Sequence, residues 1–357
     1  MRFLFLSNAK SFHTKKWVNY FVKKGYESYL ISLEKSQGTK AFEIFISPKT
    51  KYPFIKYLLA LPEIKNLIRK INPDLVNAHF IPNYGLLGAL SKRKPLVVSV
   101  WGSDVLISPR KSFLHKLRTK YVLSRADLVT CDGINLVQEL SKLGIENERI
   151  VYAPMGVEHK LLKERSAYGG FEDKEEIILL SLRSLEPVYD LKTLIKAIAL
   201  IIEKTHKKVK LWIIGEGSQK EELSRLSLNL GIEKKIEFKG YISREELEEL
   251  FQKADIYIST SLSDSTSVSL LEAMASGLLP VVSDIPGNRE WIKDGENGFL
   301  FPAKDFQALA QKIFWVMNNF KEIDKVREEN QKIIGEKALW EENMKTIEGR
   351  FLKLLKR

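Results

Sequence analysis

The segment IYISTSLSDSTSVSLLEAMASGLLPVVS, residues 256–283, contains two short apolar runs on either side of a longer stretch of small and apolar residues. The runs Ile256–Ser259 and Leu279–Ser283 have the length and the branched side chains of buried strands. A helix is expected to begin near Ser267, between the two runs. Strand, helix and strand in this order are typical of a parallel sheet whose strands are joined by crossover helices.

The same alternation of apolar runs and helix-like segments extends along the whole chain in two arrays. The first array is predicted to contain strands at Arg2–Leu6, Tyr29–Ser32, Leu75–Ala78, Leu96–Val100, Leu128–Cys131 and Ile150–Tyr152. The second is predicted to contain strands at Ile177–Leu182, Lys210–Ile214, Ile236–Lys239, Ile256–Ser259 and Leu279–Ser283. The polar stretch Glu158–Glu176 is the best candidate for a linker. An α/β protein with two Rossmann-like, doubly wound domains facing across a cleft is therefore expected.

The domain prediction assigns residues 1–163 to the first domain and residues 164–339 to the second. The terminal segment Trp340–Arg357 is amphipathic and basic, and it is expected to form a helix packed back on the first domain.

The 357 residues are 44 % apolar and 29 % charged, which is the composition of a soluble globular protein. No run approaches the roughly 18 consecutive apolar residues that a membrane span needs, and the apolar start is too short for a signal peptide. A cytoplasmic protein is expected. The only cysteine, Cys131, lies in a strand-like run and is expected to be a buried thiol. Five scattered histidines predict no metal site.

The net charge of +12 is unevenly distributed along the chain. Residues 1–165 contain 28 Lys and Arg against 13 Asp and Glu, a net charge of +15, whereas the remainder has a net charge of −3. Aromatic residues such as Tyr52, Phe54, Tyr57 and Phe113 lie among the basic ones. The basic half is expected to contact an anionic partner, for which a membrane surface, a phosphorylated lipid and nucleic acid are the candidates. The alternative is a solvated Lys-rich surface.

Small hydroxyl residues fill the turn between the strand that ends at Ser259 and the helix that begins near Ser267. Small residues let a ligand approach the backbone, and the free N–H groups of a helix N-terminus favour anions. Asp264 in the turn and Glu272 one turn into the helix are both able to accept hydrogen bonds from ligand hydroxyls. A diphosphate or a sugar fits such a site. The alternative is that Asp264 caps the helix and Glu272 is a surface residue.

The spacing of Asp264 and Glu272 resembles the glutamate-x7-glutamate signature of the family-four retaining glycosyltransferases (glycosyl transferases group 1), which have the GT-B fold. Gly277–Glu290 and Asp294–Leu300 are similar to the strand and loops that follow it in that family. The resemblance implies that Asp264, in place of the usual Glu, contacts the donor sugar and that Glu272 holds the nucleotide ribose. It also implies sugar contacts from the backbone amides of Ser265, Thr266 and Ser267, and phosphate contacts from those of Val268 and Ser269.

Arg183 follows a predicted strand, where a guanidinium would bind a diphosphate and stabilise its growing charge. The family pairs this Arg with a Lys five residues later, but Val188 occupies that position here. Lys192, Arg289 or the helix dipole is expected to supply the missing charge. A surface ion pair is the alternative role for Arg183.

Three further residues of the second domain are assigned to the donor. Gly215 and Gly217 form a turn similar to the family's Gly-x-Gly turn beside the nucleotide, although a strand-to-helix turn also needs glycine for conformational reasons. Tyr241 lies in a segment that resembles the loop contacting the base.

The first domain is expected to bind the acceptor. The segment VVSVWGSD, residues 97–104, resembles the family's strand that ends in His-Gly-x-Asp, with Trp101 in the place of the His. Trp101 is predicted to pack against a sugar face, and Asp104 to accept a hydrogen bond from an acceptor hydroxyl or to hold the turn. Lys10, His13 and His79 are further pocket candidates, with a structural role as the alternative for His79.

The resulting prediction is a metal-independent, retaining hexosyltransferase of polysaccharide biosynthesis that needs no cofactor besides its co-substrate, a nucleoside diphosphate sugar of the UDP or GDP type. The acceptor is expected to be a glycan, lipid-linked or small-molecule hydroxyl, presented by the first domain at the inner face of the cell membrane. No nucleic-acid partner is expected. The alternatives are a sugar-nucleotide epimerase of similar two-domain fold and a non-catalytic module that binds anionic surfaces.

Overall fold

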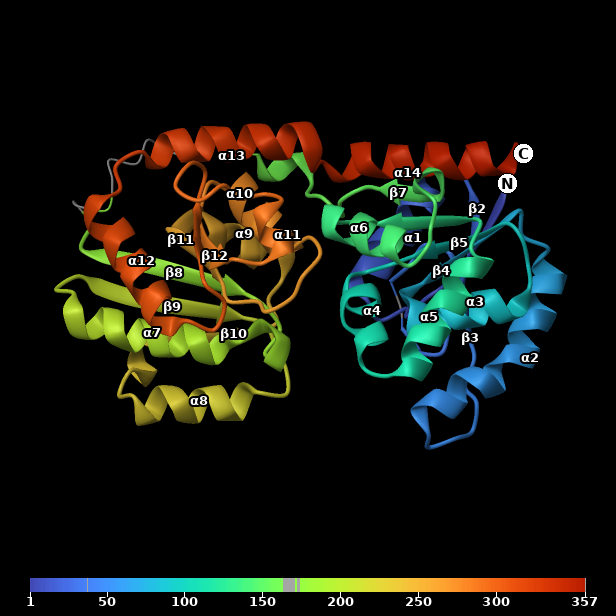
Figure 1. Ribbon diagram of the computed structural model, residues 1–357, viewed down its shortest axis with the longest axis horizontal. Coiled ribbons are helices and arrows are strands. Elements are labelled where there is room, and N and C mark those ends of the chain that lie inside the picture. The colour runs from blue at the N-terminus through green and yellow to red at the C-terminus, as the bar shows by residue number, and fades with distance from the viewer. Residues whose placement is uncertain (37, 163–170, 172–173, 357) are drawn as a thin grey trace. The chain divides into compact units, whose positions relative to one another are not determined.

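The computed structural model describes residues 1–36, 38–162, 171 and 174–356, and the chain divides into two units (Figure 1). Unit 1 comprises Met1–Pro154 and Met344–Arg357, and unit 2 comprises Met155–Asn343. About half of the predicted linker Glu158–Glu176 lies outside the described residues. The units divide at Pro154, slightly before the predicted boundary at residue 163. None of the helices in the described chain is both long and apolar enough to cross a membrane.

Unit 1 contains a parallel sheet with the strand order β3-β2-β1-β4-β5-β6-β7 in the described chain. Its strands are β1 (Arg2–Leu6), β2 (Glu27–Ser32), β3 (Phe42–Phe45), β4 (Leu75–His79), β5 (Leu96–Ser99), β6 (Leu128–Cys131) and β7 (Ile150–Tyr152). Its helices are α1 (Phe12–Lys23), α2 (Pro53–Ile71), α3 (Leu86–Ser91), α4 (Ser103–Leu106), α5 (Phe113–Arg125), α6 (Ile134–Lys142) and most of α14 (Trp340–Leu355). Cys131 is buried in β6, as its apolar surroundings predict.

Alternate residues of each strand face opposite sides of this sheet, and each side is covered by helices. Leu4 and Leu6 of β1 pack into the core beneath α2, α3, α5 and α6. Phe3 of β1 points the other way, toward Phe21 of α1 and Phe351 of α14, whose rings stack with centroids 5.5 Å apart. The carboxyl-terminal helix therefore completes the hydrophobic core of unit 1.

Unit 2 contains a second parallel sheet with the strand order β10-β9-β8-β11-β12-β13 in the described chain. Its strands are β8 (Glu176–Leu182), β9 (Lys208–Ile214), β10 (Ile236–Gly240), β11 (Ile256–Ser259), β12 (Leu279–Ser283) and β13 (Phe299–Phe301). Its helices are α7 (Leu191–Lys204), α8 (Lys220–Asn229), α9 (Arg244–Lys253), α10 (Val268–Ala275), α11 (Pro286–Arg289), α12 (Phe306–Asn319) and α13 (Ile323–Lys337).

The connections of unit 2 reverse direction between its two central strands. Leu179 of β8 packs with α7, α8 and α12 on one face of the sheet, and Leu180 packs with α9, α10 and α13 on the other. The chain leaves β8 toward α7 and leaves the neighbouring β11 toward α10, so the two loops diverge onto opposite faces. Ligands of doubly wound sheets bind at such a point, beyond the carboxyl ends of the strands.

Candidate functional site

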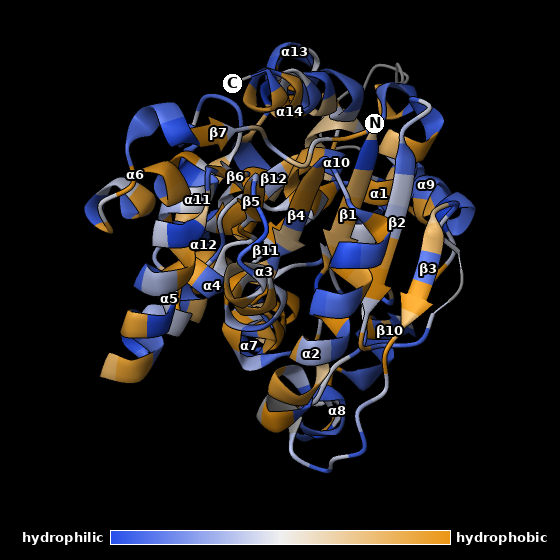
Figure 2. Cartoon of the chain, turned by 90° about the vertical axis from the view of Figure 1, so that its right-hand side faces the viewer, coloured by the Kyte–Doolittle hydropathy of each residue, from blue (hydrophilic) through white to orange (hydrophobic). Residues whose placement is uncertain are grey.

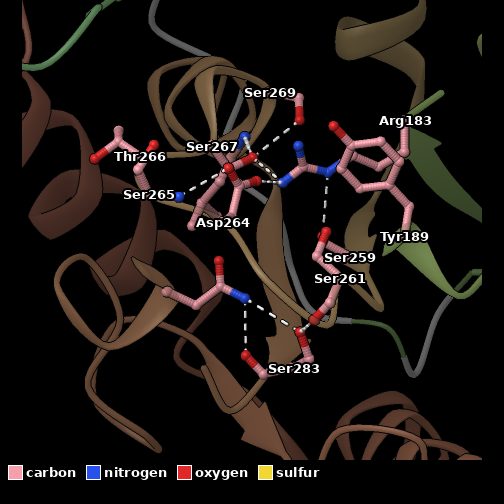
Figure 3. A network of polar contacts seen from close by, with 12 residues as sticks. Arg183, Tyr189, Ser259, Ser261, Asp264, Ser265, Thr266, Ser267, Ser269 and Ser283 are labelled. Atoms are coloured by element: carbon pink, nitrogen blue, oxygen red, sulfur yellow. Dashed lines mark hydrogen bonds and ion pairs between the residues drawn. The ribbon is translucent and has the colours of Figure 1, made fainter. Parts of the chain in front are cut away.

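Arg183 lies at this switch point, one residue beyond the end of β8, and its guanidinium is held from three sides (Figure 3). Nη2 donates to Oδ2 of Asp264 at 2.7 Å and to the Ser267 hydroxyl, and Nε donates to the Ser259 hydroxyl at 3.3 Å. The ring of Tyr189 lies 5.1 Å from the guanidinium carbon, in a cation–π arrangement. The predicted residues Arg183, Asp264 and Ser267 are therefore brought together.

This network fixes the charge state of Arg183 as well as its position. Burial opposes the charge, but interactions with Tyr257 and Asp264 outweigh it and raise the pKa of Arg183 above its ordinary value. Arg183 therefore stays cationic at every physiological pH. Nη1 makes no hydrogen bond to the described residues, so it is the nitrogen that remains available to an anionic ligand.

Helix α10 begins beside the Arg183 guanidinium with a polar first turn. Ser267 is its N-cap and accepts a hydrogen bond from the backbone N–H of Leu270 at 3.1 Å. The alternative that Asp264 caps the helix is wrong, because Asp264 instead binds Arg183 and accepts a hydrogen bond from the Ser265 amide. The backbone amide of Val268, one residue after the cap, belongs to the first turn, whose N–H groups have no intrahelical acceptor. Because Arg183 binds the hydroxyl of the cap residue Ser267, its guanidinium lies beside the positive end of α10.

Glu272, one turn into α10, is buried and forms an ion pair that spacing alone does not reveal. Its Oε1 accepts a hydrogen bond from Nη1 of Arg244, the first residue of α9, at 2.5 Å. Arg244 also approaches Glu248, with a separation of 3.8 Å from Nε to Oε1. Ser243 caps α9, because its hydroxyl accepts a hydrogen bond from the Glu246 amide at 3.1 Å. Arg244 lies three residues after Tyr241, in the segment predicted to contact the base. This closeness in the sequence is the only sign in the sequence that Arg244 belongs to the site.

The loop before α10 rests on a second polar layer that sequence reasoning did not identify. The Ser283 hydroxyl donates to the carbonyl oxygen of Ser261 at 2.5 Å, and Asn288 donates to the carbonyl oxygen of Ser283 at 2.8 Å. Gly287 packs so closely that a Cβ there would lie 2.2 Å from the carbonyl oxygen of Ser265. The segment after β12 therefore positions the backbone of the Asp264 loop.

The glycines after β9 approach the backbone next to Arg183. A Cβ on Gly215 would lie 2.3 Å from the carbonyl oxygen of Arg183, and a Cβ on Gly217 would lie 2.5 Å from that of Leu185. Their absent side chains let the two loops meet. Tyr241 follows β10 and is 84 % exposed, so its ring is available to a ligand.

The two basic residues proposed to replace the missing Lys are engaged elsewhere. Lys192 pairs with Glu222 at 2.6 Å, and Arg289 pairs with Asp284 through both carboxylate oxygens. The side chain of Val188 carries no charge, and its backbone carbonyl oxygen accepts a hydrogen bond from the Leu262 amide at 2.8 Å. Arg183 and the first turn of α10 are therefore the positive groups that this part of the described structure brings together.

In unit 1, the predicted residues lie at or just beyond the carboxyl ends of β1, β4 and β5. Three of them, His13, His79 and Trp101, form an aromatic cluster. The ring of Trp101 lies 5.8 Å from that of His13 and 5.3 Å from that of His79. His79 is buried, with hydrogen bonds to Ser7 at 3.1 Å and Asn77 at 2.9 Å. This geometry favours the structural role that was the alternative for His79.

The remaining predicted residues of unit 1 differ in exposure. Asp104 is fully buried, and its oxygens accept hydrogen bonds from the amides of Ile81 at 3.1 Å and Trp101 at 2.9 Å. Burial raises the pKa of Asp104 to about 6 despite these bonds. Its contacts are those of a residue that holds the turn. Lys10 is exposed in the loop after β1.

Burial lowers the pKa of both ring-packed histidines, to about 4 for His13 and about 3 for His79, with Lys16 adding to the effect on His13. Both rings are therefore neutral near pH 7. Nδ1 of His13 is buried and has no hydrogen-bond partner among the described residues. Over those same residues, no group of three or more His, Cys, Asp or Glu side chains is arranged to hold a metal ion.

Comparison with known proteins gives a consistent result for both units. Residues 2–133 match the family model described as glycosyl transferase 4-like, and residues 164–333 match that of the glycosyl transferases group 1. The putative glycosyltransferase EpsD of Bacillus subtilis is 27 % identical over 330 residues, which cover 85 % of this chain and 83 % of EpsD. N-acetyl-α-D-glucosaminyl L-malate synthase of Bacillus anthracis is 23 % identical over 83 % of this chain and 77 % of its own.

Solved structures show the same fold at lower identity. The Anabaena protein HepE, solved in complex with UDP and glucose, superimposes with a TM-score of 0.81 at 17 % identity, covering 99 % of this chain and 100 % of HepE.

Proposed function

Because the chain belongs to the glycosyl transferases of group 1 and has a two-domain GT-B fold, we propose that it transfers a hexose-type sugar from a nucleoside diphosphate sugar to a hydroxyl group. The donor is of the UDP or GDP type, and the configuration at the anomeric carbon is retained. The acceptor is a hydroxyl of a glycan, of a lipid-linked sugar or of a small molecule. The relatives support a role in polysaccharide or glycoconjugate biosynthesis.

The observation that carries this proposal is the position of Arg183. Its guanidinium is fixed by Asp264, Ser259 and Ser267, while Nη1 remains unbonded within the described chain beside the first turn of α10. A fixed cation and a helix N-terminus that converge on one place suit a diphosphate. We assign the phosphates to Arg183 and to the amides of Val268 and Ser269.

In the proposed reaction, the bond from the anomeric carbon to the diphosphate breaks, and its electron pair leaves with the phosphate oxygen. Arg183 and the first turn of α10 stabilise the negative charge that grows on this oxygen. The acceptor hydroxyl forms the new bond from the same face of the sugar, and its proton passes to the departing phosphate. Asp264 accepts hydrogen bonds from the sugar, and Glu272 from the ribose. Since the protein supplies the cation, the proposed reaction needs no metal ion.

Thermal unfolding in the presence of UDP, GDP and uridine tests the donor site, because a ligand of the folded state raises the midpoint by mass action. We expect one nucleoside diphosphate to stabilise the native chain, and Arg183→Gln and Glu272→Gln to abolish the effect. Lys332→Gln, at an exposed position of unit 2, is the matched control and should respond like the native chain. Equal stabilisation of Arg183→Gln would overturn the assignment.

Product analysis by NMR separates the reaction classes once the donor is known. Transfer with retention, undiminished by a metal chelator, is the expected result. An inverted product would contradict the proposed stereochemistry. Free nucleotide together with an altered sugar, formed without any acceptor, would instead establish the epimerase alternative.

A further inference from the structure

Helix α5 of unit 1 presents apolar side chains on its outer face as well as on its inner one. The exposed fractions are 74 % for Phe113, 74 % for Leu114, 45 % for Leu117 and 40 % for Tyr121. Since residues four apart lie on the same side of a helix, Phe113, Leu117 and Tyr121 form one continuous stripe. Figure 2 shows orange apolar bands on this helix, at the lower left. A helix that covers a core normally turns a polar face outward, so this outer face has no packing partner among the residues that the structure describes.

The start of helix α2, in the same unit, has the same design. The exposed fractions are 68 % for Tyr52, 42 % for Ile55, 42 % for Leu58 and 53 % for Leu59. Both helices run from the carboxyl edge of the parallel sheet back to its amino edge, because each connects parallel strands. Their first turns therefore lie at the edge of unit 1 that carries His13 and Trp101. Scattered exposed apolar residues are ordinary, but two clusters on one edge of a unit indicate an interaction surface.

The sequence segments that carry both clusters contain charges of one sign, and the acidic side chains that pair with them, Glu34 with Lys56 and Glu139 with Arg110, come from other segments. Between Asp104 and Asp127 the chain contains six Lys and Arg and no acidic residue, and between Glu43 and Glu63 it contains three Lys and no acidic residue. Lys111, Lys116 and Lys120 are exposed and form no ion pair within the described chain, whereas Lys56 is bonded to the carbonyl oxygen of Leu33. The partner of this surface is therefore both apolar and anionic.

We propose that the outer faces of α5 and the start of α2 form a docking surface for an anionic lipid bilayer. Phe113, Leu114 and Leu117 enter the interfacial region, and the exposed lysines contact lipid phosphates. A symmetric contact between two copies of the chain would place the basic residues of α5 against their own counterparts, which repel. This inference does not depend on the proposed function, because lipid binding requires neither donor nor turnover.

Co-sedimentation of the full chain with lipid vesicles tests the surface. The expected result is binding to vesicles that contain phosphatidylglycerol, weaker binding to vesicles of phosphatidylcholine alone, and release by high salt. Lys116→Gln combined with Lys120→Gln should weaken binding about 10- to 30-fold, since each basic residue near an anionic surface contributes about 1 kcal/mol. Phe113→Ser combined with Leu114→Ser should weaken it by about tenfold or more.

Matched controls are available in unit 2. Leu228, 62 % exposed on α8, is the apolar control as Leu228→Ser, and Lys234→Gln combined with Lys332→Gln is the charge control. Both controls should bind vesicles like the native chain. Because all substituted side chains are exposed, thermal unfolding should show that every variant is folded.

Three results would overturn the proposal: no binding to anionic vesicles, equal binding to neutral ones, or binding that the α5 variants leave unchanged. Light scattering measures the oligomeric state and so tests whether a second copy of the chain occupies the surface instead. A dimer that Phe113→Ser with Leu114→Ser dissociates, in a chain that ignores vesicles, would assign the surface to a second copy instead.

Discussion

Nη1 of Arg244 lies 2.5 Å from Oε1 of Glu272, so the carboxylate assigned to the nucleotide ribose is held by a cation from the neighbouring helix. The pair joins the start of α9 to the second turn of α10, across 28 residues of sequence. The ion pair with Arg244 fixes the position of the Glu272 carboxylate. We therefore regard Arg244 as a positioning residue for the proposed donor site.

Glu272→Gln should weaken nucleoside diphosphate binding about 10- to 100-fold, because hydrogen bonds to a charged group contribute about 1.5–3 kcal/mol. Calorimetric titration with nucleoside diphosphate and with inorganic pyrophosphate measures the effect. Pyrophosphate has no ribose, so its affinity should stay unchanged. A parallel loss of both ligands would show that Glu272 acts on the phosphates or on folding.

Arg244→Gln should weaken nucleoside diphosphate binding by less than Glu272→Gln does, and the double variant should lose less than the sum of the single losses, because the two side chains act as one unit. Arg225→Gln removes an exposed pair with Glu221 on α8 and is the matched control. Tighter binding by Arg244→Gln would contradict the positioning role, since it would mean that Arg244 competes with the ribose.

Arg183→Lys should lower kcat about 10²- to 10³-fold, because an ammonium group cannot bind Asp264, Ser259, Ser267 and a phosphate at once. Steady-state kinetics at saturating donor measure the loss. Lys192→Gln and Arg289→Gln are the controls, since both side chains are paired elsewhere, and each should stay within about twofold of native activity. A larger loss from either control than from Arg183→Lys would transfer the catalytic charge to that residue.

Gly287→Ala should reduce donor affinity, although Gly287 has no side chain and is not itself assigned to the donor. The added Cβ would meet the carbonyl oxygens of Ser265 at 2.2 Å and Asp264 at 2.6 Å, so the loop before α10 must move. Titration with nucleoside diphosphate and thermal unfolding measure both consequences.

The control is Gly335→Ala in α13, where the nearest atom outside its own helix lies 3.9 Å from the added Cβ. This substitution should raise the free energy of unfolding by about 0.5–1 kcal/mol, because alanine favours helix more than glycine does. Native donor affinity in Gly287→Ala would show that the contact does not position the loop.

The free energy of unfolding should fall as the pH drops from about 6.5 toward 4. The pKa values of His13 and His79 in the folded chain, about 4 and about 3, lie below the value of about 6.5 for an unfolded His, so the unfolded chain binds more protons in this range. Each ring should cost on the order of 2 kcal/mol at pH 5. Asp104 opposes this trend, because its raised pKa of about 6 makes its contribution to stability grow as the pH drops through 6.

Denaturant unfolding of His13→Phe at several pH values checks this prediction. The variant should lose less stability than the native chain between pH 7 and pH 5, because phenylalanine does not titrate. His206→Gln, at an exposed position, should follow the native chain. Identical pH dependence of His13→Phe and the native chain would place the His13 ring in solvent.

Local patterns in the sequence predicted most of the secondary structure. The strands Arg2–Leu6, Leu128–Cys131, Ile256–Ser259 and Leu279–Ser283 have the expected bounds. Two strands are not predicted from the sequence. Phe42–Phe45 is an edge strand of the unit 1 sheet that is largely exposed, so it lacks a buried apolar run. Phe299–Phe301 is an edge strand of the unit 2 sheet that has only three residues and follows a turn-rich loop.

The sequence by itself determined the class of fold, the family and the segment that contains Asp264 and Glu272, because strand periodicity, helix caps and a spaced motif act over a few consecutive residues. Only the tertiary structure decided which side chains are partners. Arg183 meets Asp264 across 81 residues and Arg244 meets Glu272 across 28, while Lys192 and Arg289 pair elsewhere. Such pairs depend on strand order, which brings β8 beside β11, and strand order is set by the packing of the entire unit.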